Sequence, residues 1–383
     1  MKSDIQIFFA GDFCSRPPTD KITVSKELKS LIQSCDLKVV NFEAPLKPDT
    51  KSPHLGGERL FQNDDAPGFL CGLGFNLFQL ANNHAFDWKD EGFLKTKATL
   101  ADAAFGAGTY EEAMRVKILE VKGEKVGFLA CCYAANKGEF NDVSNHDRLG
   151  CAYIQDLRMN HVILNAKKEV DYLFVLPHDG IEYIDIPMPE TIARYRDFID
   201  YGADGVIGTH PHCPQGWETY KGKPIFYSLG NFLFNSKEGY GYRATDRPYW
   251  YEGLCVVLKL SGGEVVPELY YTRNVDNVGI VLEKTMEREE HMRTVCSYLS
   301  DREKYKQYFD KAISKLVVEK ELPILDTTFH RATFWQSCRA LVKFFVHRKL
   351  LGRQNDDAGL QRLLRHDTRR FALLRFLKNY PSV

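Results

Sequence analysis

The sequence lacks several patterns that would assign it quickly to a class of protein. Its ten cysteines include no Cys-x-x-Cys pair, so a cysteine zinc site is not indicated. Several cysteines lie in apolar runs, as small core residues do, and we expect a reducing, cytoplasmic compartment. No stretch reaches the ~18–20 apolar residues of a membrane span, and the apolar run at residues 5–10 is too short for a signal peptide. We therefore expect neither export nor a transmembrane anchor.

The chain also lacks an excess of charge of either sign, but its charges are unevenly distributed. From His330 to the C-terminus there are 12 Lys+Arg against 3 Asp+Glu, a net charge of +9, which leaves −9 for residues 1–329. No RNA- or DNA-binding motif accompanies the basic stretch, so we expect no nucleic-acid partner. Two interpretations of it stay open. Its helices either dock on the acidic part of the chain or form basic amphipathic surfaces that contact a membrane or a partner protein.

The order of apolar runs and helically spaced segments predicts an α/β fold. Buried strands are expected at residues 5–10, 36–40, 75–80, 125–131, 171–176 and 203–207. Helical spacing appears between them at residues 23–33, 91–103, 156–168 and 189–201. Antiparallel pairs follow at residues 217–227 and 254–271. This order predicts two packed sheets with helices outside them.

From Thr285 onward the sequence predicts helices and no further strand. The expected helices lie at residues 286–299, 301–318, 329–348 and 359–377. A chain of 383 residues with 44% hydrophobic residues exceeds what one core usually holds. We therefore expect an α/β domain at 1–284 and a helical, basic C-terminal region at 285–383. The oligomeric state is not indicated.

Six polar residues of kinds that bind metal ions follow apolar strands. They are Asp12, Glu43, Asn83, His178, His210 and His212. Because one sheet brings the ends of its strands to a common edge, we expect these side chains to converge. Two acids, one amide and three imidazoles suit Mn²⁺, Fe²⁺ or Zn²⁺ better than Ca²⁺, and are too many for one tetrahedral ion. Two ions bridged by a carboxylate would use them all and would activate a water near a phosphoryl group.

Each of these residues also has a structural explanation. Asp12 can cap a turn, Asn83 can hold a left-handed turn, and Glu43 can accept hydrogen bonds from backbone N–H groups. Taken singly these explanations are preferred, but the coincidence of six favours a metal site. His84, beside Asn83, is suited to protonate a leaving oxygen. We expect Glu182 and Asn231 to support metal-bound imidazoles rather than to bind metal.

Five segments in order resemble the motif set of the CapA family of poly-γ-glutamate or capsule biosynthesis proteins. They are Gly11-Asp12, Asn41-Phe-Glu43-Ala-Pro-Leu46, Ala81-Asn-Asn-His-Ala-Phe-Asp87, His178-Asp-Gly-Ile-Glu182-Tyr183, and the run from Gly208 to Phe232 with its His-Pro-His and Ser-Leu-Gly-Asn. The resemblance spans about residues 4–282. This family is similar in fold to calcineurin-like metallophosphoesterases. The resemblance therefore implies a four-layer α/β/β/α sandwich. It does not cover the expected C-terminal helices, which we take as a helical appendage to that sandwich.

The resemblance also implies roles for residues. Two divalent transition metals would share the ligands, with Asp12 and His212 on one ion, Asn83, His178 and His210 on the other, and Glu43 as the bridge. His84 would be the catalytic acid, and Arg16 would bind substrate. Arg59 is a further candidate for substrate binding, on different grounds, because we expect the loop at residues 46–65 to face the substrate. The first site departs from the superfamily pattern, which has Asp-x-His where this chain has Asp12-Phe-Cys14, and usually a bridging Asp in place of Glu43. We interpret Cys14 as a small buried cysteine.

The function implied is that of a metal-dependent, phosphoesterase-like hydrolase in capsule or cell-surface polymer biosynthesis. Its substrate would be a phosphorylated or polymeric precursor. The alternative is a non-catalytic polymer-binding or assembly factor that works beside a membrane-bound synthetase. Retention of His84 beside Asn83 favours chemistry. We expect a cytoplasmic protein, and the basic helices allow a peripheral position at the inner membrane face or contact with a synthetase.

Overall fold

The computed structural model describes residues 4–49, 60–133, 148–235, 249–318 and 375. These residues form two compact units, of which the first ends at Ser300 and the second begins at Asp301. In the second unit, α8 (Arg302–Leu316) carries Asp310, whose Oδ1 accepts a hydrogen bond from Arg375 Nε at 2.7 Å. The basic segments expected to be helical at 329–348 and 359–377 lie outside the described residues except for position 375. The boundary at 284/285 therefore stays a prediction.

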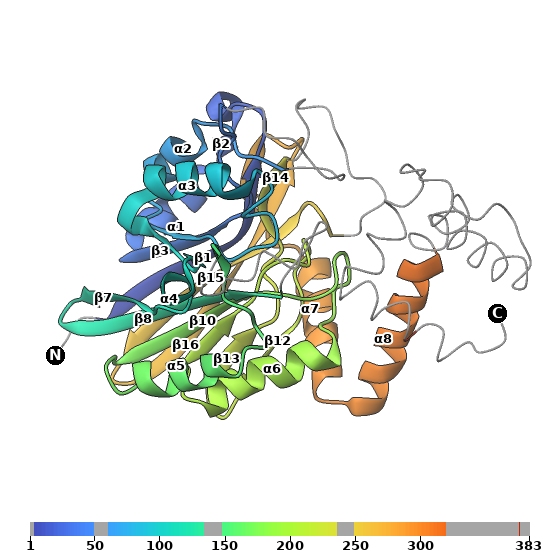
Figure 1. Cartoon of the computed structure of the whole chain (residues 1–383). Coiled ribbons are helices and arrows are strands. Elements are labelled where there is room, and N and C mark those ends of the chain that lie inside the picture. The colour runs from blue at the N-terminus through green and yellow to red at the C-terminus, as the bar shows by residue number, and fades with distance from the viewer. Residues whose placement is uncertain (1–3, 50–59, 134–147, 236–248, 319–374, 376–383) are drawn as a thin grey trace, which may run out of the picture. The chain divides into compact units, whose positions relative to one another are not determined.

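The larger sheet of the first unit is built around β1 (Ile5–Ser15). Its nine strands run in the order β2-β17-β16-β15-β1-β3-β4-β5, and β14 also pairs with β1. The other strands span Thr23–Val24 (β2), Leu37–Phe42 (β3), Leu77–Gln79 (β4), Ala104–Phe105 (β5), Asn231–Asn235 (β14), Glu252–Ser261 (β15), Glu264–Val275 (β16) and Gly279–Leu282 (β17). Figure 1 shows β1 in the middle of this sheet.

The smaller sheet has six strands in the order β12-β13-β11-β10-β8-β7. They span Lys117–Val121 (β7), Glu124–Cys132 (β8), Tyr172–His178 (β10), Gly205–Ile207 (β11), Trp217–Tyr220 (β12) and Lys223–Phe226 (β13). The expected hairpin around Gly123 is confirmed, because β7 and β8 pair antiparallel across it. A separate two-stranded ribbon joins β6 (Ala107–Gly108) to β9 (Gly150–Cys151).

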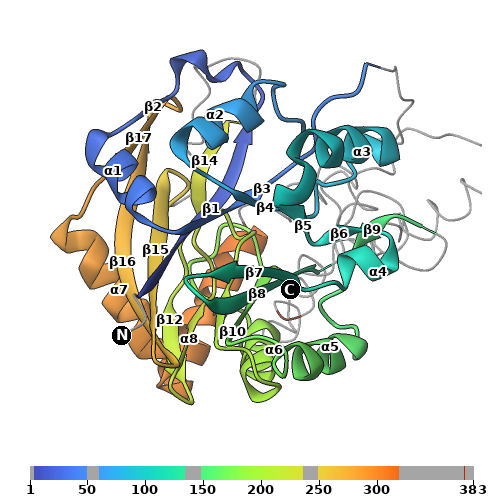
Figure 2. The ribbon, with the colours of Figure 1, turned by 90° about the vertical axis from the view of Figure 1, so that its left-hand side faces the viewer.

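The two sheets pack face to face through aromatic side chains. The ring of Phe9 on β1 lies 6.3 Å from that of Phe128 on β8 and 6.0 Å from that of Phe174 on β10, measured between ring centroids. Helices cover the outer faces (Figures 1 and 2). They are α1 (Lys26–Ser34), α2 (Ala66–Leu73) and α3 (Lys89–Leu100) on the larger sheet, and α5 (Arg158–Ala166) and α6 (Pro189–Asp200) on the smaller. The predicted four-layer α/β/β/α sandwich is confirmed.

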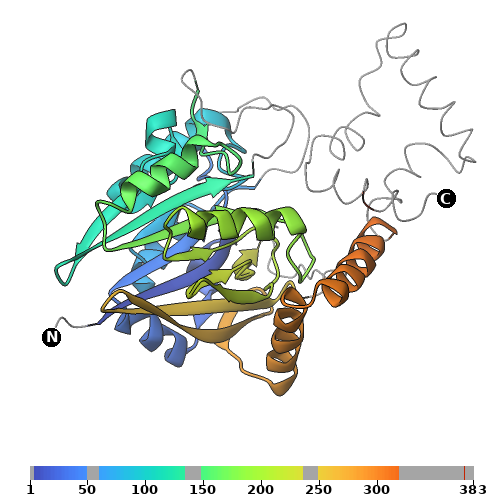
Figure 3. The same ribbon diagram turned by 90° about the horizontal axis from the view of Figure 1, so that it is seen from below.

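Two further helices complete the first unit. The short α4 (Tyr110–Ala113) begins with a capping box in which Thr109 and Glu112 exchange hydrogen bonds. The longer α7 (Met286–Leu299) is tied to the sheets, because Trp217 N–H donates to Cys296 Sγ at 3.3 Å. Figure 3 shows α5 and α6 in green across the outer face of the smaller sheet and α7 in orange. None of the described helices is long and apolar enough to cross a membrane.

Element ends differ from the sequence prediction where a partner strand decides them. The helix expected from Thr23 begins instead after Ser25, whose Oγ accepts a hydrogen bond from Leu28 N–H, because Val24 pairs with β17. The strand expected to end at Leu176 continues to His178 because β8 stays paired with it that far. The hydrogen-bonded partner strands, rather than the composition of the element itself, therefore set these limits.

The largest difference concerns β1, which was expected to end at Ala10. Residues Ile5–Phe9 pair antiparallel with β15, and residues Asp12–Ser15 then pair in parallel with β14, a strand that the sequence did not predict. The register against β3 shifts between Ala10 and Asp12. Asp12 therefore lies at an irregular point inside a strand instead of at its tip.

Gly11 permits this change of partner, and its substitution should test it. A Cβ at Gly11 would lie 1.8 Å from the carbonyl oxygen of Gly230, which also accepts the Asp12 N–H at 2.9 Å. We expect Gly11→Ala to lower the free energy of unfolding by about 2–4 kcal/mol, because a backbone atom must move. Gly68→Ala in α2 is the matched control, since its Cβ meets nothing within 4 Å, and should be stabilising by ~0.5–1 kcal/mol. Urea denaturation measures both, and equal effects would contradict the crossing described.

Candidate metal centre

The six residues predicted to bind metal lie together between the two sheets. Asp12 comes from β1 and Glu43 follows β3, whereas His178 ends β10. Asn83 follows β4, and His210 and His212 follow β11. All six are buried, with exposed fractions of 0–5%. One sheet was expected to supply the common edge, but both sheets contribute, because their packed faces bring two sets of strand ends together.

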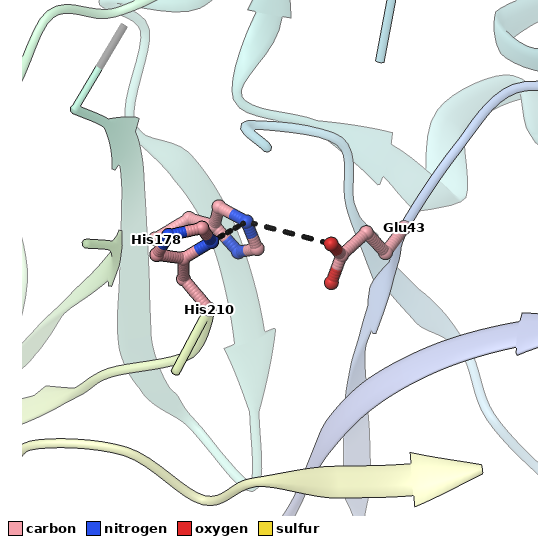
Figure 4. Close-up of side chains that lie close together, drawn as sticks. All are labelled: Glu43, His178 and His210. Carbon is pink, nitrogen blue, oxygen red and sulfur yellow. Dashed lines mark hydrogen bonds and ion pairs between the residues drawn. The ribbon is translucent and has the colours of Figure 1, made fainter. Parts of the chain in front are cut away.

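One group of donor atoms surrounds the side chain of His178. Its Nε2 lies 3.2 Å from His210 Nδ1, 2.9 Å from Asn83 Oδ1 and 3.8 Å from Glu43 Oε1. Figure 4 shows Glu43, His178 and His210 turned toward one another. Separations of about 3 Å are typical of nitrogen and oxygen atoms that share an ion at 2.0–2.2 Å. Glu43, His178 and His210 are accordingly a group that could hold a metal ion.

A second group consists of Asp12, Glu43 and His212, whose candidate ligand atoms all lie within 4.8 Å of one another. His212 Nδ1 is 2.9 Å from Asn231 Oδ1 and 3.5 Å from Asp12 Oδ2. The Asn231 amide oxygen can only accept, so Nδ1 carries the proton and Nε2 keeps its lone pair. That Nε2 lies 3.6 Å from Glu43 Oε1. Two electron-rich atoms that face each other in this way fit a cation between them.

Glu43 belongs to both groups, and its carboxylate is only partly satisfied by hydrogen bonds. Its Oε1 is buried and has no hydrogen-bond partner among the residues that the structure describes. Burial, followed by the charge of Asp12, raises the pKa of Glu43 well above its usual range, and burial likewise raises the pKa of Asp12. Burial and the neighbouring His210 hold the pKa of His178 well below its usual value. A divalent cation would offset each of these penalties, so the donor set fits such an ion.

Asn41 joins the two carboxylates, a role that was not predicted from the sequence. Its Nδ2 donates to Asp12 Oδ1 at 2.7 Å and to Glu43 Oε2 at 3.2 Å. Its Oδ1 accepts from Asn82 Nδ2 at 3.2 Å, which fixes the direction of the amide. A signal was present in the sequence, since residues two apart at a strand end share a face and Asn41 precedes Glu43 by two. Asn41 therefore positions both candidate ligands.

His84 lies beside both groups and faces Glu43. Its Nδ1 is 2.8 Å from Asp87 Oδ2, and its Nε2 is 3.9 Å from Glu43 Oε1. Asp87 Oδ2 also accepts the Leu60 N–H at 2.7 Å. An Nδ1–H donated to Asp87 directs Nε2 toward the centre, the orientation that a proton donor needs. Asp87 is a second residue whose role was not predicted from the sequence, although it closes the segment that begins at Ala81.

The loop that carries the two late histidines adopts an uncommon backbone conformation. His210 and His212 have φ values of 103° and 57°, on either side of Pro211, and Ala44, just after Glu43, has a φ of 97°. Such left-handed conformations cost about 1–3 kcal/mol for residues other than glycine. They turn the imidazoles of residues i and i+2 toward one region. The strain lies beside candidate ligands, where a functional constraint is its simplest cause.

The remaining predicted site residues lie around these groups. Asn231 holds His212 and donates to the Trp250 carbonyl oxygen at 3.0 Å. Glu182 is partly exposed, and its charge is a smaller contribution to the raised pKa of Glu43. Arg16 places its guanidinium over the Phe61 ring, 4.5 Å from the centroid. Cys14 is fully buried beside Phe61 O, outside both donor groups. Arg59 lies outside the described residues, and all these roles stay predictions.

Fold and site together define an α/β/β/α sandwich with a buried carboxylate–imidazole cluster at its strand ends. The model of the family described as bacterial capsule synthesis protein PGA_cap matches residues 6–236. This range is more than half of the chain, and the protein belongs to that family. The resemblance drawn from the five motifs is therefore confirmed.

The individual relatives have low sequence identity to this chain. The chain is 28% identical to the PGA biosynthesis protein CapA of Bacillus subtilis, over 59% of this chain and 62% of that protein. It is also 28% identical to the capsule biosynthesis protein CapA of Bacillus anthracis, over 55% and 54%. The chain thus spans less than two thirds of the length of these relatives. A solved phosphatase of Mycoplasma pneumoniae is 14% identical, with a TM-score of 0.42 over 76% of this chain and 98% of that one.

The raised pKa of Glu43 predicts how metal-free protein should respond to pH. Between the unfolded pKa of about 4.5 and the raised folded pKa, the native state binds more protons than the unfolded state, so stability falls as pH rises. We expect Glu43→Gln to remove much of this loss. In that window the free energy of unfolding of the chelator-treated variant should therefore rise relative to that of the wild type by up to about 1.4 kcal/mol per pH unit. Exposed Glu264→Gln is the control. Urea unfolding from pH 5 to 8 with parallel curves for wild type and Glu43→Gln would contradict the account.

Proposed function

We propose that this protein is a metal-dependent, phosphoesterase-like hydrolase that acts in capsule or cell-surface polymer biosynthesis. The observation that carries the proposal is the buried, incompletely satisfied Glu43 carboxylate shared by two groups of candidate ligands. Membership of the capsule synthesis family supports the biological setting. Relatives named for capsule and PGA biosynthesis support a polymer or its precursor as substrate.

The proposed ligands divide into two sets. Asn83, His178 and His210 would hold one ion, Asp12 and His212 would hold the other, and Glu43 would be shared by the two sets. Oxygen and imidazole donors without thiolate favour Mn²⁺, Fe²⁺ or Zn²⁺. The set with three donors of its own should hold its ion more firmly than the set with two. Asn41 contributes by fixing both carboxylates with one amide.

The chemistry follows from what each group can supply. When bound, two such ions neutralise phosphoryl oxygens and lower the pKa of a coordinated water. His84 holds a proton at Nε2, on the side of Glu43, while Asp87 accepts its Nδ1–H. Asp87 stabilises the charged imidazole and fixes its direction, so His84 can deliver the proton to a leaving oxygen. Asp12 and Glu43 are fully buried, so the reacting region is shielded from water, which strengthens these electrostatic interactions.

A non-catalytic assembly factor is the second candidate. The observation that favours it is a Mycobacterium tuberculosis relative, 30% identical over 46% of this chain and 50% of that protein, named as a probable polyglutamine synthesis accessory protein. A protein of this kind could keep the metal centre to hold its loops in place. A polymer synthetase would then be its partner. Metal content and turnover together distinguish the two candidates.

Metal content tests the ligand assignment first. Purified protein should carry one to two equivalents of a transition metal by elemental analysis, and His178→Ala or His210→Ala should lower that content, because each removes a ligand from the three-donor set. His161→Ala is the matched control, since His161 is an exposed residue of α5. Metal-free wild type, or unchanged content in both ligand variants, would count against the assignment.

Turnover tests the role of His84. On any phosphomonoester or phosphodiester that the wild type hydrolyses, His84→Ala should reduce turnover by roughly 10²–10⁴-fold while metal content stays near wild type. Asp87→Asn should act in the same direction and shift the pH profile, because it changes the partner of Nδ1. Loss of metal in His84→Ala would show that His84 is a ligand. Full metal content with no turnover across the substrate panel would favour the assembly factor.

A further inference from the structure

Tyr133, the residue that follows β8, contacts each member of the three-donor set. Its hydroxyl oxygen accepts a hydrogen bond from Asn83 Nδ2 at 3.4 Å. Its ring lies 4.6 Å from the His210 imidazole, measured between ring centroids. Its backbone N–H donates to the His178 carbonyl oxygen at 3.1 Å. Only 4% of Tyr133 is exposed, so burial holds the side chain in the place where it makes these contacts.

The backbone of Tyr133 is placed by the pairing of two strands. β8 pairs with β10 in parallel as far as Cys132 and His178, and the Tyr133 N–H adds one hydrogen bond beyond that pair. This bond belongs to the main chain, so it remains when the side chain at position 133 is replaced by that of another residue with an N–H group. Substitutions at this position therefore report on the ring and the hydroxyl.

The Tyr133 hydroxyl favours one of the two orientations of the Asn83 amide. An amide side chain has an oxygen that can bind a metal ion and a nitrogen that only donates hydrogen bonds. Because Asn83 Nδ2 donates to Tyr133, Oδ1 faces the other way and lies 2.9 Å from His178 Nε2. The reversed amide would turn N–H groups toward the position where a cation would bind. The hydroxyl thus holds Asn83 in the orientation that suits a ligand.

The Tyr133 ring restrains a second candidate ligand. His210 Nδ1 faces His178 Nε2 at 3.2 Å, and this direction depends on how the His210 imidazole is rotated. The phenol ring packs against that imidazole at an angle of 44° between the ring planes. A neighbouring aromatic ring at this distance limits the rotation of the imidazole. Ring and hydroxyl therefore act on two different ligands of the same ion.

We propose that Tyr133 is a positioning residue that holds Asn83 Oδ1 and His210 Nδ1 toward one divalent cation. The inference rests on the ligand sets of the proposed function. It does not require hydrolysis, because a metal centre that only holds loops in place needs its ligands oriented in the same way. Groups that orient a ligand commonly determine metal affinity almost as strongly as the ligands do.

The set formed by Asp12 and His212 is packed by other side chains. The His212 ring lies 4.4 Å from the Phe234 ring and 5.1 Å from the Trp250 ring, measured between centroids. Its Nδ1 is held by Asn231 at 2.9 Å. His212 is thus oriented by contacts that do not involve Tyr133. We therefore expect Tyr133 to affect the binding of one ion and not of the other.

Titration calorimetry of Zn²⁺ into chelator-treated, full-length protein tests this inference. Tyr133→Phe removes the hydroxyl and keeps the ring, and should weaken the binding of one ion by about 10-fold, the lower end of the range for groups that orient a ligand. Tyr133→Leu also removes the ring and should weaken that ion further. Tyr227→Phe is the matched control, because it removes a buried hydroxyl that donates to Glu218, outside both donor groups. It should bind Zn²⁺ as the wild type does.

A double-mutant cycle separates positioning from general destabilisation. Because the hydroxyl acts through Asn83, Tyr133→Phe should cause no further loss of Zn²⁺ affinity in an Asn83→Ala background. It should keep its effect of about 10-fold in a His212→Ala background, which lacks a ligand of the other ion. A structural role alone would give the same loss in both backgrounds.

The outcomes distinguish this inference from the proposed function. Weakening of one ion in Tyr133→Phe that disappears in the Asn83→Ala background supports the inference, even if no phosphoester is hydrolysed. Unchanged Zn²⁺ affinity in Tyr133→Phe, equal weakening of both ions, or an equal loss in Tyr227→Phe would overturn it. Hydrolysis by a protein that gives any of these results would leave the proposed function standing alone. A wild type that binds no Zn²⁺ would overturn the inference and the ligand assignment together.

Discussion

Burial of two carboxylates against three imidazoles is the constraint on which the rest of this structure depends. Asp12 and Glu43 are fully buried, and an ionised carboxylate in such surroundings is costly unless it is paired. The Asn41 amide and the His210 N–H supply donors, yet Glu43 Oε1 keeps none among the described residues. Protonation or a bound cation must offset the remaining cost. The cluster by itself would therefore destabilise the folded protein, and the packing of the two sheets around it must offset that cost.

The surrounding strands hold the backbone beside the cluster in conformations that it would not adopt by itself. His210, His212 and Ala44 have positive φ, and the surrounding strands must over-determine them for such conformations to persist. β1 changes partner at Gly11, where its backbone approaches that of Gly230 closely enough to exclude a side chain. This change places Asp12 at an irregular point, from which its carboxylate reaches the Asn41 amide and the His210 N–H. The geometry of the site thus depends on which strands pair with each half of β1.

The sequence predicted the layers and the converging residues because both depend on local patterns. Apolar runs that end in Asp, Asn or His indicate strands that deliver polar side chains to a sheet edge, and His178 and His210 obey that rule. The continuation of β1 beyond Ala10 could not be predicted, since its partner β14 begins only at Asn231 and has no periodicity of its own. The sharing of the site between two sheets escaped prediction for a related reason. Sheet packing is decided by tertiary contacts such as those of Phe9, which no local spacing encodes.

Asn41 and Asp87 illustrate a different limit. Each lies in a segment that was recognised from the sequence, but the role of each depends on which atoms it reaches. Asn41 contacts two candidate ligands with one nitrogen, and Asp87 orients His84 through a carboxylate oxygen that a backbone N–H also binds. A list of metal-ligand residue types omits both kinds of contact. Residues that position a ligand can be identified only from the hydrogen bonds that they form in the structure.

The range matched by the family model is smaller than the unit that must fold to support the site. Residues 6–236 contain all the candidate ligands but exclude β15, which pairs with Ile5–Phe9 in the first half of β1. They also exclude α7, whose Arg288 donates to Glu252 at 3.1 Å and to the Gly253 carbonyl oxygen at 3.0 Å on β15. Without these elements β1 would lose the partner that fixes its first half, and Asp12 lies just beyond that half. The candidate metal centre therefore depends on residues that the family motifs do not contain.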